Sequence, residues 1–364
     1  MRYSSYNYHE LYAIREKKML HGGDVYRNKI SYDFSVNGNP LGMPQAVKEA
    51  LSQAIFHCNR YPDPEQEKLV KALSEKYERK QEETILGNGA SELFLAYIHA
   101  EQPQKVLLPV PSFAGYVKAC QACPCEIIPY HLKKENQFTI TQDFLQEMKE
   151  EVDCIFLANP NNPVGNCIDK PLLLQILEKA KENHIRVILD ECFLEFTDVE
   201  KELSMLSCLD NFPQVLLVRA FTKIYGIPGV RLGYGFSTDT FLIKKMKKHL
   251  PEWNISLFAQ YAGAAALKSD EYVRNTVKEV AKERAFLAEK MKKFGFEVFD
   301  ARADFIFFYT DMELYQPLLQ QEILIRDCQN YDGLTKGYYR IAVKTHEENL
   351  ILLQAIEKLQ QKGC

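Results

Sequence analysis

The chain has 364 residues, of which 46% are hydrophobic and 26% charged, a composition typical of a globular protein with one large core and a second, smaller one. Its net charge of −4, with both signs mixed, gives no reason to expect nucleic acid or a membrane surface as a partner. The first residues lack a signal-peptide core, and no apolar run reaches the roughly 18 residues of a membrane span. We therefore expect a cytoplasmic protein.

The ten cysteines are scattered, and several lie in apolar segments such as "VDCIFLA" and "LDECFLEF". This distribution favours reduced thiols over a disulfide framework. Cys120, Cys123 and Cys125 in "CQACPC" have spacing that resembles a metal site, but no second ligand pair lies at a usable distance. Because structural zinc normally takes four ligands, we expect no metal.

The elements in chain order begin with a segment, 1–40, that we expect to form an N-terminal arm or part of the small domain. Ile85 and Leu86 then mark a first short strand, and further apolar runs alternate with helical patterns such as 170–183. These runs predict strands over 105–109, 125–130, 153–158, 185–190, 214–218 and 232–236.

Continuous apolar strands that alternate with helices predict an α/β fold, with a mostly parallel central sheet covered by helices. We assign this large domain to 41–250. A long charged helix (270–294), strands near 304–309 and 338–343 and a final helix (346–361) predict a smaller α+β C-terminal domain, 251–364.

Polar groups follow four of the predicted strands. The segment "NPNNPVG" with Asn162 follows 153–158, Asp190 ends 185–190, Lys223 follows 214–218, and "GNGASE" follows Leu86. Ligands of parallel sheets bind beyond the carboxyl ends of the strands. The four groups therefore predict one site at that edge of the sheet.

Each of these groups also has an ordinary structural explanation. "GNGASE" is typical of a capped helix start and matches neither the Walker loop nor the dinucleotide fingerprint. Asn162 sits in a proline-bracketed turn, and Lys223 could lie on the surface. A carboxylate at the end of an apolar strand, such as Asp190, needs a cationic or donor partner. Their common position at strand ends favours the site.

Pyridoxal phosphate (PLP) requires this set of groups. Its aldehyde needs a lysine, its ring nitrogen a carboxylate, its phosphate a helix N-terminus with an arginine, and its phenolic oxygen an amide. The chain offers Lys223 as the catalytic amine, Asp190 for the ring, and further cofactor-binding candidates Gly89, Ala90, Ser91, Asn162, Thr222 and Arg231.

The motifs resemble those of fold-type I PLP enzymes, the aminotransferase class I/II superfamily, over nearly the whole chain. "NPNNPVG" is similar to the family's N-P-x-N-P-x-G, "DECF" to D-E-x-[YF], and "TKIYGIPGVRLGY" to its lysine segment. The resemblance implies a homodimer in which Tyr61 of "RYPDP" reaches the neighbouring subunit's cofactor. It also implies that Phe113 stacks on the cofactor and that Arg340 binds a substrate anion.

Within the superfamily, the chain resembles the branch of threonine-phosphate decarboxylase and histidinol-phosphate aminotransferase. "HGGDVY", "DFSVNGNPLG" and "LIRDCQNYDGL" are closer to the decarboxylase, and Phe193 replaces a tyrosine usual in the aminotransferase. The resemblance implies a phosphorylated amino compound as substrate, bound by His21, Gly22, Gly23, Asn37, Arg326 and Arg340. It favours L-threonine O-3-phosphate decarboxylation in cobamide synthesis. A histidinol-phosphate aminotransferase or a related class I/II aminotransferase is the alternative, and a non-catalytic relative is a distant one.

Two residues depart from the family pattern. Ala220 replaces a hydroxyl residue that usually contacts the cofactor phosphate, and Asp304 in "ADFIFF" stands where asparagine is common. The first departure predicts slightly weaker cofactor binding. The second introduces a carboxylate near a site for anions and leaves the substrate open.

Overall fold

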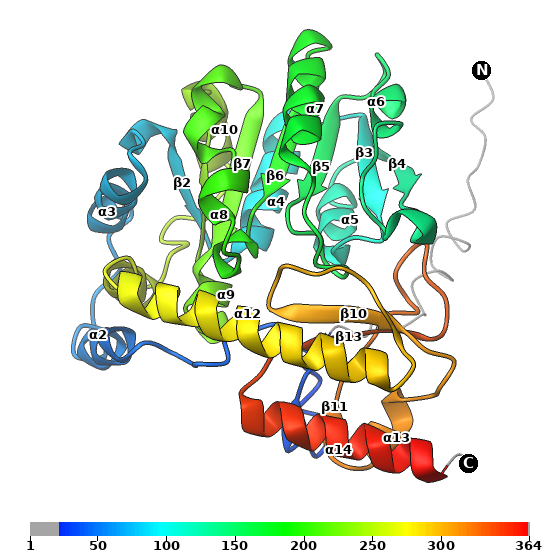
Figure 1. Ribbon diagram of the computed structural model, residues 1–364. Helices are drawn as coiled ribbons and strands as arrows, with labels where there is room; N and C mark the ends of the chain where they lie inside the picture. The colour runs from blue at the N-terminus through cyan, green and yellow to red at the C-terminus, as the bar shows by residue number, and fades with distance from the viewer. Residues whose placement is uncertain (1–21, 363–364) are drawn as a thin grey trace, which may run out of the picture.

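A computed structural model describes residues 22–362. A large body built around a central sheet lies above a smaller lobe in Figure 1, and the long helix α12 (Asp270–Lys293) runs along the boundary between them. Val280 of α12 belongs to the core of the large body, whereas Leu287 and Met291 belong to the second core. One helix thus joins the two cores.

The central sheet has seven strands in the order β2-β8-β7-β6-β5-β3-β4. Five neighbouring strands are parallel, and β8 runs antiparallel to both β7 and β2. The prediction of a mostly parallel sheet is confirmed. The strands are β2 (Thr84–Gly87), β3 (Lys105–Val110), β4 (Glu126–His131), β5 (Cys154–Ala158), β6 (Arg186–Asp190), β7 (Val215–Ala220) and β8 (Gly233–Phe236).

One boundary differs usefully from the sequence prediction. Strand β7 continues beyond 218 because Arg219 and Ala220 pair with Tyr234 and Gly233 of β8. The chain then enters the short helix α9 (Phe221–Ile224) directly, so Lys223 stands three residues beyond the sheet.

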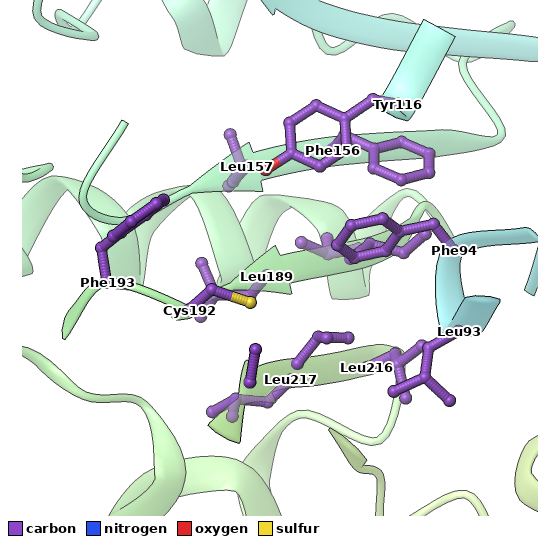
Figure 2. Close-up of a cluster of buried hydrophobic side chains, with 14 of the residues drawn as sticks. Leu93, Phe94, Tyr116, Phe156, Leu157, Leu189, Cys192, Phe193, Leu216 and Leu217 are labelled. Atoms are coloured by element: carbon purple, nitrogen blue, oxygen red, sulfur yellow. The ribbon is translucent and has the colours of Figure 1, made fainter. Parts of the chain in front are cut away.

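Helices cover the sheet and bury apolar faces at helical spacing. In α7, for example, Leu173, Ile176, Leu177 and Ala180 are fully buried. Figure 2 shows Phe94 and Tyr116, from two of these helices, over side chains of the central strands, with Cys192 and Phe193 just beyond β6. The helices are α2 (Gln45–Ile55), α3 (Glu67–Tyr77), α4 (Ala90–Glu101), α5 (Ala114–Cys120), α6 (Phe144–Glu147), α7 (Lys170–Glu182), α8 (Glu200–Leu203), α10 (Thr240–Lys247) and α11 (Leu257–Ala266).

The smaller lobe has a four-stranded antiparallel sheet in the order β12-β13-β10-β9. Side chains alternate along β10: Phe305 and Phe307 enter the large core, and Ile306 and Phe308 the second core. The elements are β9 (Glu297–Val298), β10 (Phe305–Tyr309), α13 (Tyr315–Leu319), β12 (Arg326–Asp327), β13 (Tyr338–Ala342) and α14 (His346–Lys362).

The end of the predicted N-terminal arm belongs to this lobe in space. Its strand β1 (Tyr32–Asp33) pairs in parallel with β11 (Ile323–Leu324), and Phe34 is buried in the second core. None of the helices in the described part of the chain is long and apolar enough to cross a membrane. Within residues 22–362, no group of three or more metal-binding side chains is arranged to hold an ion.

Candidate active site

A pocket with about 670 Å³ of empty space, open solvent included, lies beyond the carboxyl ends of β5, β6 and β7. It is large enough for a cofactor-sized ligand. It brings together eight predicted site residues that come from separate segments of the chain: Ala90, Ser91, Phe113, Asn162, Asp190, Thr222, Lys223 and Arg231.

Lys223 is partly buried in this pocket. Its Nζ donates a weak hydrogen bond to the carbonyl oxygen of Asn37 (3.4 Å) and lies 5.1 Å from the centre of the Phe193 ring. Burial lowers the pKa of the amine, and the negative charge of Asp304 opposes that effect. A lysine with a lowered pKa has a larger fraction of neutral amine, the form that acts as nucleophile or base.

Asp190 is buried at the end of β6 and keeps its carboxylate fully hydrogen-bonded. The Tyr116 hydroxyl donates to Oδ2 (2.6 Å), and the backbone N–H of Cys192 donates to Oδ1 (2.9 Å). Burial raises the pKa of Asp190, whereas both hydrogen bonds act in the opposite direction. The arrangement holds a carboxylate in place for a cationic group inside the pocket.

The turn between β2 and α4 has the features of an anion-binding site. Gly89 has a φ of 82° and precedes the 12-residue helix α4, whose first N–H groups lack partners within the helix. A Cβ at Gly89 would collide with the guanidinium group of Arg231. The positive φ favours glycine here, and the close approach shows that Arg231 lies against the helix N-terminus, where a phosphate would be held.

Asn162 links the pocket to the smaller lobe. Its Oδ1 accepts a hydrogen bond from Nη1 of Arg340 on β13. That contact uses the amide oxygen, and the amide nitrogen of this pocket residue has no hydrogen-bond partner among residues 22–362. Nη2 of Arg340 donates to the carbonyl oxygen of Ser35 (2.8 Å).

Arg326 lies directly opposite Arg340 on the paired strand β12, and both side chains are buried. It lines a second hollow, which does not include Lys223 or Asp190. Its guanidinium donates to the backbone oxygen of Asp327 and to Oδ1 of Asn330, each at 2.9 Å. The two arginines thus occupy paired positions on neighbouring strands: Arg340 contacts Asn162 of the pocket, and Arg326 lines the second hollow.

The glycine pair of "HGGDVY", Gly22 and Gly23, packs against Ser35, which Arg340 also contacts. Gly23 N–H donates to the Ser35 hydroxyl (2.7 Å), and a Cβ at Gly22 would collide with the Ser35 carbonyl, which Arg340 also contacts. His21 lies outside the described residues. Asn37 is buried, and its Oδ1 has no hydrogen-bond partner among the described residues.

Tyr61 does not reach this pocket. Its side chain is 77% exposed and stacks on Trp253, with ring centres 4.6 Å apart. Of the two residues that depart from the family pattern, Ala220 is buried and lines the pocket. Asp304 is fully buried and directly precedes β10.

Two contacts of the site were not predicted from the sequence. Tyr116 was missed although it lies three residues after Phe113, a spacing that places both on one face of α5. The backbone N–H of Cys192 was missed because the bond depends on the turn after β6 and not on the side chain.

The fold and the pocket define a class of protein. Residues 29–356 match the family model of aminotransferase class I and II, and the chain belongs to this family of PLP-dependent enzymes. The chain is 33% identical to the threonine-phosphate decarboxylase of Salmonella typhimurium, over 90% of each chain.

Solved structures of two aminotransferases share the fold. The histidinol-phosphate aminotransferase of Clostridium acetobutylicum is 30% identical, with a TM-score of 0.86 over 91% of this chain and 99% of that one. The enzyme from Sinorhizobium meliloti, solved with pyridoxal-5'-phosphate, is 18% identical, with a TM-score of 0.82 over 96% and 97% of the two chains.

The residues present fit PLP, the cofactor of this family. Lys223 would bind the aldehyde, and Asp190 would pair with the ring nitrogen. Arg231 and the N-terminus of α4 would hold the phosphate, and the free amide of Asn162 would face the phenolic oxygen. Thr222 and Phe113 line the same pocket beside them.

Proposed function

We propose that this enzyme decarboxylates L-threonine O-3-phosphate, a reaction that serves cobamide synthesis. The observation that supports it best is the pairing of Arg326 with Arg340 on adjacent strands: both side chains are buried, and Arg340 bonds to Asn162 of the pocket. Two fixed guanidinium groups suit a small substrate with a phosphate and a carboxylate. The 33% identity to a threonine-phosphate decarboxylase supports the same substrate.

In this proposal, PLP supplies an aldehyde for the substrate amine and a ring that accepts electrons from the substrate α-carbon. Asp190 stays ionised and fixed by Tyr116 and Cys192, so that it stabilises a positive ring nitrogen. When CO2 leaves the α-carbon, Lys223 Nζ gives that carbon a proton, which the amine regains from water. Arg340 and Arg326 orient the two anionic groups of the substrate, and burial of both keeps water from competing for them.

Transamination of histidinol phosphate is the alternative, supported by the 30% identity to an aminotransferase of that specificity. Phe193 favours the decarboxylase: its ring faces Lys223 Nζ without a hydroxyl, where the aminotransferase usually has tyrosine. A non-catalytic relative is disfavoured by the intact set of Lys223, Asp190, Asn162 and Arg231 around one pocket.

The deciding experiment gives the purified, PLP-loaded enzyme each substrate in turn. With L-threonine O-3-phosphate alone, we expect stoichiometric release of CO2. With histidinol phosphate and a 2-oxo acid, we expect no consumption of the 2-oxo acid. The opposite pattern would replace the decarboxylase with the aminotransferase, and inactivity on both would remove the proposed substrate class.

We also propose a homodimer with shared active sites. Tyr61 is exposed and outside its own pocket, and the large exposed side chains Phe56, Trp253 and Phe258 give the chain an apolar surface that a second copy would cover. Mixing inactive Tyr61→Ala and Lys223→Ala proteins should restore about a quarter of the wild-type activity, because random exchange gives half heterodimers with one intact site. A monomer with full activity would contradict this proposal.

A further inference from the structure

Asp304 is a buried carboxylate without a hydrogen-bond donor. Its side chain is 0% exposed, and neither Oδ1 nor Oδ2 has a partner among the described residues. Its backbone is fixed, because its carbonyl oxygen accepts the N–H of Val343 (2.7 Å). Leaving a charge buried and unpaired destabilises a fold, so the residue is not explained by stability.

The neighbourhood of Asp304 is the edge of the active site. The next residue, Phe305, packs edge-on against Phe193 with ring centres 5.2 Å apart, and the Lys223 amine lies over that Phe193 ring. The Arg340 guanidinium lies 5.3 Å from the centre of the Phe305 ring. Nε of Arg340 is itself buried and has no partner among residues 22–362.

Positive charges surround this carboxylate. Those that act on it belong to Lys223, Arg340 and Lys344, and it acts in turn on Arg284 of α12. The charged and titratable groups that act on Lys223 include Asp304, Arg340, Cys192 and Arg231. Asp304 has the largest effect of the charged groups on Lys223, and it raises the pKa of an amine that burial and two arginines lower. Asp190, at the end of β6, also interacts with Lys223.

We propose that Asp304 is a positioning residue for the reaction: its buried carboxylate is the counter-charge that sets the protonation of Lys223 and balances Arg340 beside the substrate. The inference rests on the proposed role of Lys223 as the amine that binds PLP. When Lys223 Nζ carries a proton, ionised Asp304 stabilises that charge. When Nζ is neutral, Asp304 can itself hold a proton, so the buried charge of the pair stays balanced.

The test follows the visible absorption of the PLP-loaded enzyme through a pH titration, because this absorption reports the charge at Lys223 Nζ. Removing a negative neighbour destabilises the cation. In Asp304→Asn, which keeps the side-chain shape, the midpoint should fall by about one pH unit, the lower end of the shift caused by a close opposite charge. That shift is a tenfold change in the proton-binding constant. Asp304→Glu, which restores the carboxylate, should move the midpoint back toward the wild-type value.

Glu195→Gln is the matched control. Glu195 is also buried, has an oxygen without a partner among the described residues, and does not belong to the groups that act on Lys223. Its substitution should leave the titration midpoint unchanged. An unchanged midpoint in Asp304→Asn, or an equal shift in Glu195→Gln, overturns the inference.

The proposed function fails in a different way. If Lys223→Ala keeps the visible absorption of the wild type, Lys223 does not bind the cofactor and the basis of the inference is gone. If Lys223→Ala lacks the visible absorption while Asp304→Asn titrates like the wild type, only the role of Asp304 is excluded.

Discussion

The end of β6 and the start of β10 each bury an aspartate, and the two carboxylates have opposite surroundings. Asp190 accepts hydrogen bonds from Tyr116 and from the Cys192 N–H, whereas Asp304 accepts none from the described residues. Burial raises the pKa of both, to about 6 for Asp304, and the charge of Lys223 lowers both. Hydrogen bonds from two other residues therefore favour the ionised form of Asp190, whereas the ionised form of Asp304 is favoured by its own backbone and by the surrounding charges.

We propose different tasks for the two aspartates because of this difference. A carboxylate fixed by two donors keeps its charge and its direction, as an ion partner for a cofactor ring requires. A carboxylate without donors responds to the charges around it, as a titrating counter-charge requires. Five substitutions test the contrast, in order of decreasing expected effect.

Lys223→Ala removes the charge that both aspartates share. We expect loss of the visible cofactor absorption and a fall in turnover of at least about a hundred- to ten-thousandfold, the range for a general acid–base group. Single-turnover assays of the PLP-loaded protein measure it. Lys344→Ala, another lysine whose charge acts on Asp304, is the control and should retain the absorption.

Asp190→Asn would remove the proposed pairing of the carboxylate with the cofactor ring. Loss of one partner of a buried ion pair costs about 3–5 kcal/mol, so kcat/KM should fall on the order of a hundred- to a thousandfold or more. The same change at position 304 removes an equally buried carboxylate and should cost less activity. Equal losses in the two asparagine variants would remove the distinction between the aspartates.

Asp304→Asn should change how stability depends on pH. A carboxyl whose pKa rises from 3.8 to about 6 on folding favours the protonated form, so wild type loses stability as pH rises through this window. Two pKa units correspond to about 3 kcal/mol at 1.36 kcal/mol per unit. The free energy of unfolding of the variant, relative to wild type, should therefore increase by about 3 kcal/mol between pH values of about 4 and 7. Parallel profiles for the two proteins would show that Asp304 stays ionised throughout.

Arg326→Ala tests whether Arg326, the strand partner of Arg340, binds the substrate phosphate. Loss of a charge-assisted hydrogen bond costs about 1.5–3 kcal/mol, which is roughly a ten- to hundredfold loss of kcat/KM. The loss should appear with the phosphorylated amino acid and be smaller with its unphosphorylated form. Arg340→Ala, assayed alongside, should weaken both forms because it also contacts Asn162. An equal effect of Arg326→Ala on both forms would show that Arg326 does not bind phosphate.

The sequence predicted the parts of the site that lie directly after strands. Asn162, Asp190 and Lys223 follow apolar runs whose strand character is unambiguous, so their meeting at one edge follows from parallel topology. Contacts between distant segments could not be predicted from the sequence. The hydrogen bond from Arg340 to Asn162 depends on how the small lobe packs on the large body, and no local pattern encodes that packing.

The same limit explains why the hydrogen bonding of the two aspartates could not be predicted. In the sequence, Asp190 ends a strand and Asp304 precedes one, and both look like buried carboxylates in need of a partner. Whether a donor reaches each of them is decided by Tyr116, 74 residues before Asp190, and by the absence of a comparable donor near Asp304 among the described residues. Satisfaction of a buried polar group is a tertiary property.

Tyr116→Phe makes Asp190 more like Asp304 by removing one of its two donors. The ring remains and keeps its packing against Phe156 and Phe113, so the change isolates the 2.6 Å hydrogen bond. Because this bond lowers the pKa of Asp190 against the effect of burial, its loss should raise that pKa further. The acid limb of the kcat/KM profile should then move to higher pH, while activity on the alkaline side of the limb falls only by about fivefold, the equivalent of about 1 kcal/mol for a hydrogen bond. A matched removal of a buried tyrosine hydroxyl elsewhere, Tyr97→Phe, should leave the limb in place. If Tyr116→Phe also leaves it in place, the hydrogen bond from Tyr116 does not favour the ionised form of Asp190, and this bond no longer distinguishes the two carboxylates.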